Sequence, residues 1–232
     1  MTDRSPGTVL VTGAASGLGR AVAQAVAAAG GTPLCLDLRD SPDGYAGRVV
    51  DLADPRAAEA AVAAVAEEGG GLDAVVTCAG TDACGQLGDV PGDTWDRVVL
   101  VNLLGTAAVV RAALPSLTAD GRYGRVVTVA STLGLRALPD ATAYCASKFG
   151  VVGFTRALAA ETAGRLGVTL LIPGGMQTAF FDGRTEQYKP GPDAKLNRPE
   201  DVAGAVLVAL GQPAGCELRE LVVASATETS WP

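Results

Sequence analysis

Short apolar runs alternate with longer alanine-rich stretches along almost the whole chain. A run in which every residue is apolar predicts a strand buried on both faces, and alanine-rich stretches between such runs predict helices that cover a sheet. With 232 residues, of which 48% are hydrophobic, the chain can bury a large core. The alternation therefore predicts an α/β protein with a parallel sheet.

We expect seven strands separated by helices, which fit a single Rossmann-type doubly wound parallel sheet with helices on both faces. No repeat, linker or composition shift marks a boundary, so residues 1–232 are expected to form one domain. The strands are predicted at 9–11, 33–37, 49–50, 73–77, 126–129, 168–172 and 221–223. The helices are predicted at 18–29, 55–68, 93–114, 142–163 and 199–210.

The charge and composition exclude several classes of function. A formal charge of -7 without a basic block argues against binding to nucleic acid or an anionic membrane. The sequence has no histidine, and its five cysteines form no Cys-x-x-Cys pair, so we expect neither a metal site nor a disulfide framework. Catalysis by a Ser-His-Asp or Cys-His set within this chain is excluded because both sets need a histidine. The amino terminus shows no leader pattern, and a cytoplasmic location is expected.

Three glycines, Gly13, Gly17 and Gly19, lie between the first predicted strand and the first predicted helix. Residues without side chains let the backbone turn tightly and let a pyrophosphate approach the N–H groups at the start of the helix. Packing alone explains many glycine-rich turns, but the strand and helix on either side favour a dinucleotide site.

Asp37 ends the second predicted strand, 18 residues after Gly19. A carboxylate there can accept hydrogen bonds from both hydroxyls of an adenosine ribose, and it would repel a 2'-phosphate. NAD(H) is therefore favoured, while Arg39 close by leaves NADP(H) open.

Tyr144 and Lys148 are four residues apart on a predicted helix, so they share one face. An ammonium close to a phenol favours phenolate and lowers the phenol pKa. A tyrosine tuned in this way can exchange a proton near neutral pH.

Taken together, these motifs resemble the classical short-chain dehydrogenase/reductase family. The resemblance runs from about residue 8 to 180 and rests on motifs in the family's order. They are Thr12-Gly13-x-x-x-Gly17-x-Gly19, Ala79-Gly80, Asn102, Ser131, Tyr144-x-x-x-Lys148, and Pro173-Gly174 followed by Thr178. The chain lacks the glycine-rich ending that many members have after their last strand.

The resemblance implies an enzyme that interconverts a secondary alcohol and a ketone by hydride transfer to or from a nicotinamide. Tyr144 would be the general acid/base, and Lys148 would lower its pKa and hold the nicotinamide ribose. Ser131 would stabilise charge on the reacting oxygen. Asn102 would bind a water that links Lys148 to solvent.

The resemblance also implies a set of cofactor-binding residues from several strand ends. They are Gly13, Ser16, Gly17, Leu18, Gly19, Asp37, Asp51, Leu52, Cys78, Ala79, Gly80, Tyr144, Lys148, Pro173, Gly174, Met176 and Thr178.

The stretch 178–197 interrupts the alternation with prolines, aromatic residues and charges, and it is a candidate substrate lid. Phe180, Phe181 and Tyr188 suggest apolar contact with a substrate. Arg136 or Arg184 is a candidate to hold an anionic group. The substrate itself stays open.

Two other functions are compatible with these motifs. One is an NAD-binding sensor or scaffold without turnover, which the intact set Ser131, Tyr144 and Lys148 disfavours. The other is an epimerase or dehydratase with tightly bound NAD, which usually needs a larger substrate domain. The family often pairs its two long helices across a two-fold axis, so a homodimer or homotetramer is expected.

Overall fold

The computed structural model describes residues 5–231. Residues 1–4, part of the amino-terminal stretch on which the expected cytoplasmic location rests, lie outside the described residues.

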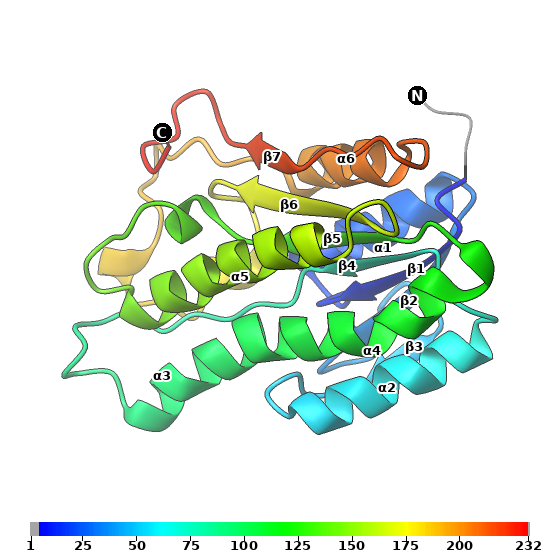
Figure 1. The fold of residues 1–232 in the computed structure, drawn as a ribbon. Helices are drawn as coiled ribbons and strands as arrows, with labels where there is room; N and C mark the ends of the chain where they lie inside the picture. The colour runs from blue at the N-terminus through cyan, green and yellow to red at the C-terminus, as the bar shows by residue number, and fades with distance from the viewer. Residues whose placement is uncertain (1–4, 232) are drawn as a thin grey trace.

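Seven parallel strands form one sheet, as predicted (Figure 1). Their order across the sheet is β3-β2-β1-β4-β5-β6-β7, so the winding reverses between β1 and β4. In such sheets, ligands bind outside the carboxyl ends of the strands at this reversal. The strands are β1 Thr8–Thr12, β2 Thr32–Asp37, β3 Gly47–Val49, β4 Ala74–Thr77, β5 Arg125–Val129, β6 Gly167–Pro173 and β7 Glu220–Val223.

Helices cover both faces of the sheet, as predicted. On one face pack α2, α4 and α5, and on the other pack α1 and α6 (Figure 1). The helices are α1 Gly17–Ala28, α2 Pro55–Glu68, α3 Gly92–Val99, α4 Thr106–Thr118, α5 Thr142–Glu161 and α6 Pro199–Leu210.

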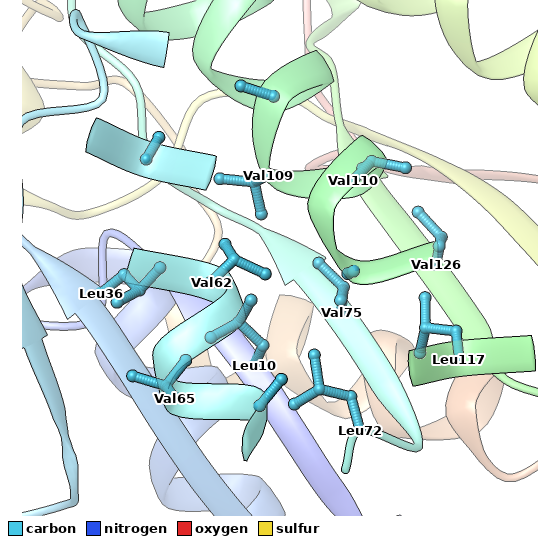
Figure 2. Packing of buried hydrophobic residues seen from close by; sticks show 14 of the residues in the cluster. Leu10, Leu36, Val62, Val65, Leu72, Val75, Val109, Val110, Leu117 and Val126 are labelled. Atoms are coloured by element: carbon cyan, nitrogen blue, oxygen red, sulfur yellow. The ribbon is translucent and has the colours of Figure 1, made fainter. Parts of the chain in front are cut away.

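The core explains why these strands are apolar at every position. Successive side chains of a strand point to opposite faces, so Leu10 packs among α2 and α4 whereas Val9 and Val11 pack against α1 and α6. Figure 2 shows Leu10 beside Val62 and Val75 in the first of these clusters. Each face of the sheet thus packs against its own hydrophobic layer. This close packing on both faces holds the carboxyl ends of the strands in fixed positions.

Two predicted elements differ from the structure. The short strand lies at Gly47–Val49 instead of 49–50, at the edge of the sheet where Val49 is exposed and apolar patterning is weak. The long helix predicted at 93–114 contains a π-helical segment, Leu100–Gly105, between α3 and α4. Apolar periodicity does not distinguish a π-helical turn from an α-helical one, so the sequence could not reveal it.

The continuous helical stretch Gly92–Gly121 is long and apolar enough to cross a membrane by length and composition. The core helix of a soluble protein passes the same test, and part of this stretch is buried against the sheet and α2. Two large apolar side chains on this side of the molecule, Leu104 and Phe149, stay exposed.

Candidate active site

A cleft of about 940 Å³ lies at the carboxyl ends of the strands, where the sheet order reverses. Its walls come from the segments that follow β1, β2, β4, β5 and β6, and from the carboxyl-terminal residues 228–230. All the cofactor-binding residues named from the sequence line this one cleft. Their individual roles stay predictions, but the fold brings them together.

The glycine turn between β1 and α1 is packed too closely for side chains. A Cβ on Gly13 would lie 2.8 Å from the backbone of Ala79, and one on Gly19 would lie 2.2 Å from the carbonyl oxygen of Gly13. The Thr12 hydroxyl also accepts a hydrogen bond from the N–H of Ala79 at 3.1 Å, which ties the turn to the end of β4. The turn therefore leaves the amino terminus of α1 open to the cleft, where unpaired N–H groups attract an anion.

Asp37 lies at the adjoining end of the cleft. Its carboxylate accepts hydrogen bonds from the backbone N–H groups of Ala15 at 3.0 Å and Arg39 at 3.2 Å. Further along this wall, the Asp51 carboxylate binds the guanidinium of Arg97, with a closest approach of 3.0 Å. Fixed carboxylates thus line the end of the cleft where the sequence predicts adenosine.

Ser131, Tyr144 and Lys148 meet at the other end of the cleft. Ser131 follows β5, and its hydroxyl accepts a hydrogen bond from the N–H of Leu133 at 3.1 Å. The helix α5 carries Tyr144 and Lys148 on one face, as their spacing predicts, and the Lys148 Nζ lies 5.7 Å from the centre of the Tyr144 ring. Its ammonium donates a hydrogen bond to the Val129 carbonyl at 2.9 Å.

The expected effect of Lys148 on the tyrosine is not what this arrangement gives. Burial raises the pKa of Tyr144 to about 12, although hydrogen bonding to Ser131 acts to lower it. Burial also lowers the pKa of Lys148 to about 8. The ammonium is directed at the Val129 carbonyl, so desolvation dominates both groups.

Asn102 lies behind the cleft instead of lining it, and its side chain is fully buried. Its amide oxygen accepts from the N–H of Thr81 at 2.8 Å, while its NH₂ group donates to the Thr81 carbonyl at 2.9 Å and the Ser147 hydroxyl at 3.0 Å. Asn102 thus braces the segment after β4 against α5. A water relay through it stays a prediction.

The predicted lid borders the same end of the cleft. Phe180, Phe181 and Tyr188 all line it, and the Phe180 ring lies 5.7 Å from the Tyr144 ring. Arg184 also lines the cleft, but it forms an ion pair with Asp82. Arg136 is absent from the lining and donates a hydrogen bond to the Thr229 carbonyl at 2.9 Å.

Sequence reasoning missed the carboxyl-terminal contribution to the site. Glu228 and Ser230 line the cleft beside Pro173 and Gly174. The Glu228 carboxylate accepts the N–H of Gly175 at 2.9 Å, and Ser230 shares a 2.6 Å hydrogen bond with the Thr132 hydroxyl. The one sequence signal was the absence of the glycine-rich ending after the last strand, which showed that residues 224–231 differ from those of many family members.

The residues present fit a nicotinamide dinucleotide. The glycine turn supplies a cradle that any Cβ would fill, and the start of α1 supplies donors for a pyrophosphate. The Asp37 carboxylate lies where it could accept hydrogen bonds from ribose hydroxyls. This cleft is therefore the candidate cofactor site.

The family is shown by comparison with known proteins. The family model described as short chain dehydrogenase matches residues 7–189. The chain is 38% identical to D-threitol dehydrogenase of Mycolicibacterium smegmatis over 85% of its length and 83% of that protein. It is 31% identical to D-beta-hydroxybutyrate dehydrogenase of Rhizobium meliloti over 89% of its length and 92% of that protein. The chain belongs to the short-chain dehydrogenase family and is an oxidoreductase of that class.

One more relative and one solved structure resemble this chain in more limited ways. The chain is 34% identical to glycine betaine reductase ATRR of Emericella nidulans over 92% of its length, but it spans only 18% of that protein. The solved aldohexose dehydrogenase of Thermoplasma acidophilum superposes with a TM-score of 0.84 at 24% identity, covering 94% of this chain and 92% of that one. This second likeness shows the fold.

Proposed function

We propose that the protein interconverts a secondary alcohol and a ketone, with NAD(H) as the favoured cofactor and Tyr144 as the general acid/base. The observation that carries the proposal is the continuity of one cleft, which joins the glycine turn and Asp37 to Ser131, Tyr144 and Lys148. A cofactor bound along it would have its adenosine at Asp37 and its reactive ring beside Tyr144.

Each polar group at the reactive end has a role in this chemistry. The bound cofactor supplies or removes a hydride at the substrate carbon. In ketone reduction, the Tyr144 phenol gives its proton to the carbonyl oxygen, and Ser131 donates a hydrogen bond to that oxygen. In alcohol oxidation, the Tyr144 phenolate takes the hydroxyl proton. Lys148 would hold the nicotinamide ribose.

The preference for NAD(H) rests on Asp37. Its carboxylate lies on the cleft wall, where it would accept ribose hydroxyls and repel a 2'-phosphate. The side chain of Arg39 lines the same wall and tempers the preference, because a guanidinium attracts phosphate.

Pairs of this chain would meet through the exposed apolar side of α5 and of the π-helical segment Leu100–Gly105 between α3 and α4. Leu104 and Phe149 are each 45% exposed there, and a second copy would cover them. We expect a cytoplasmic homodimer or homotetramer, and sedimentation velocity of the purified protein would measure its mass.

The test is to assay the protein with a panel of ketones and secondary alcohols. Turnover is measured as the change in absorbance of the reduced nicotinamide, and each substrate is assayed with NAD(H) and with NADP(H). Turnover should be lost in Tyr144→Phe, which keeps the ring but removes the proton donor. A folded enzyme that binds the cofactor without turning over any member of a broad panel would favour a sensor or epimerase instead.

A further inference from the structure

A second cavity, of about 390 Å³, opens beside the catalytic end of the cleft. The two cavities share Gly80, Thr81, Phe180, Arg184 and Tyr188 on their walls. One side of this cavity comes from the segment after β4, and the other comes from the lid. A substrate that presents its carbonyl to Tyr144 therefore has room to extend into it.

The cavity contains a nearly buried ion pair. The side chain of Asp82 is 6% exposed and that of Arg184 is 18% exposed, and the two meet at 2.5 Å. Arg184 also donates a hydrogen bond to the Tyr188 carbonyl at 3.2 Å. Its Nε is buried and has no hydrogen-bond partner within residues 5–231. A guanidinium carries five N–H donors, and the contacts with Asp82 and Tyr188 use two of them, so terminal N–H groups of Arg184 are left for a ligand in the cavity.

Aromatic rings connect this ion pair to the reacting centre. The Arg184 guanidinium lies over Phe180 at 5.2 Å and over Phe181 at 4.6 Å. Phe180 in turn packs on Tyr144. The stacking fixes the guanidinium plane, so the ion pair holds its position relative to the carbonyl site.

The charges of the cavity oppose an anionic substrate group. Asp82 already neutralises Arg184, and the Asp140 carboxylate stands nearby, accepting a hydrogen bond from the Tyr188 hydroxyl at 3.1 Å. An entering carboxylate would face both acidic side chains. A hydroxyl can instead donate to the Asp82 carboxylate and accept from a remaining terminal N–H of Arg184.

We propose that this cavity binds a hydroxyl group of a neutral, hydroxylated ketone or alcohol through Asp82 and Arg184, and that it rejects substrates with a carboxylate at that position. The inference rests on the proposed function and names its substrate class. It replaces the expectation that Arg184 holds an anionic group.

The experiment uses three four-carbon ketones that differ only at one terminal carbon. Butanone carries a methyl group there, 4-hydroxy-2-butanone a hydroxymethyl group, and acetoacetate a carboxylate. We expect wild-type kcat/KM for the hydroxylated ketone to exceed the other two by roughly tenfold or more, since a site with buried polar groups discriminates against analogues that leave them unpaired.

The variant Asp82→Asn removes the negative charge and leaves Arg184 unneutralised. The ratio of kcat/KM for acetoacetate to that for 4-hydroxy-2-butanone should then rise about tenfold or more, because freeing a charge partner is worth at least that much in a desolvated pocket. A damaged fold cannot produce this gain. The matched control is Asp193→Asn, at an exposed aspartate of the lid, which should keep the wild-type ratio.

Calorimetric binding of the three ketones to the protein with NAD⁺ gives a readout independent of turnover. Selective binding of the hydroxylated ketone without turnover would sink the proposed function alone. Turnover in which wild type prefers acetoacetate, or in which Asp82→Asn leaves the ratio unchanged, would sink the cavity assignment alone.

Discussion

The two ends of the cleft are built in different ways. At the glycine turn, backbone packs on backbone, and Gly13 and Gly19 leave no space for a Cβ. At the substrate end, side chains far apart in sequence hold the walls together, as in Asp82 with Arg184, which are 102 residues apart, and Thr132 with Ser230, which are 98 apart. The first end is set by strands and turns, whereas the second depends on individual polar contacts.

This difference implies that the two ends respond differently to substitution. A change at the glycine turn alters the backbone and hence both cofactor binding and stability. A change in the lid or carboxyl-terminal segment alters one wall of the pocket while leaving the sheet intact.

The largest effect is expected for Gly19→Ala. The new Cβ would lie 2.2 Å from the Gly13 carbonyl oxygen, so the turn must shift. We expect the Kd for NADH to rise at least about a hundredfold, or roughly 3 kcal/mol, by fluorescence titration. The control Gly183→Ala adds a methyl group in the lid where no atom lies within 4 Å, and its Kd should match wild type. Equal effects of both substitutions would contradict this difference between the two ends of the cleft.

Lys148 is predicted to make stability depend on pH. Burial lowers the pKa of Lys148 from 10.5 in the unfolded chain to about 8 in the folded protein. Between pH 8 and pH 10.5 the unfolded chain therefore binds more protons than the folded protein, and the free energy of unfolding rises with pH. Relative to Lys148→Met, the wild-type free energy of unfolding should increase by roughly 3 kcal/mol from pH 8 to 10.5 in urea titrations. The exposed Lys195→Met should show no such trend. If the difference in unfolding free energy between wild type and Lys148→Met did not change with pH, the Lys148 ammonium would be hydrated in the folded protein.

The rate of alcohol oxidation should rise with pH, because Tyr144 must be phenolate to accept a proton. With its pKa raised to about 12, kcat/KM for oxidation should increase about tenfold per pH unit between about pH 7 and 9, while that for ketone reduction should not rise. A plateau in oxidation by pH 8 would show instead that the phenol pKa falls in the cofactor complex, as the spacing of Tyr144 and Lys148 predicts.

A smaller effect is expected for Glu228→Gln. Burial acts to raise the pKa of Glu228, but hydrogen bonds from Gly175 and Ser230 outweigh it and hold the pKa below its usual range. Gln has one acceptor oxygen instead of two, so the carboxyl-terminal segment should loosen. We expect KM for the ketone to rise about threefold to tenfold, the net cost of about one ordinary hydrogen bond, with little change in kcat. The control Glu67→Gln changes an exposed residue of α2 and should leave KM unchanged. If KM rose equally in both variants, the rise could not be attributed to the hydrogen bonds of Glu228.

The sequence predicted the architecture and the cofactor end because both depend on local patterns. Apolar runs such as residues 168–172 can be placed only between two helix layers, and the turn from Gly13 to Gly19 requires glycine whatever surrounds it. Asp37 and Tyr144 could be placed on the cleft because strand ends and helix faces follow from the same patterns.

The substrate end could not be predicted to the same depth. No periodicity links Asp82 to Arg184 or Glu228 to Gly175, because these contacts depend on how loops cross the sheet edge. The spacing of Tyr144 and Lys148 predicts a lowered phenol pKa, but burial raises the pKa of Tyr144, and burial is a property of the assembled fold.

The ion pair between Asp82 and Arg184 also bears on how this protein can diversify. Because each charge lies outside the strands and helices, replacing one of these residues can change the net charge of the second cavity without disturbing the sheet. The glycine turn offers no such freedom, since its neighbours already occupy the space of a methyl group. If the proposed substrate site is correct, descendants of this sequence would acquire new substrates by changes in the lid and the segment after β4, while the glycine turn stays constant.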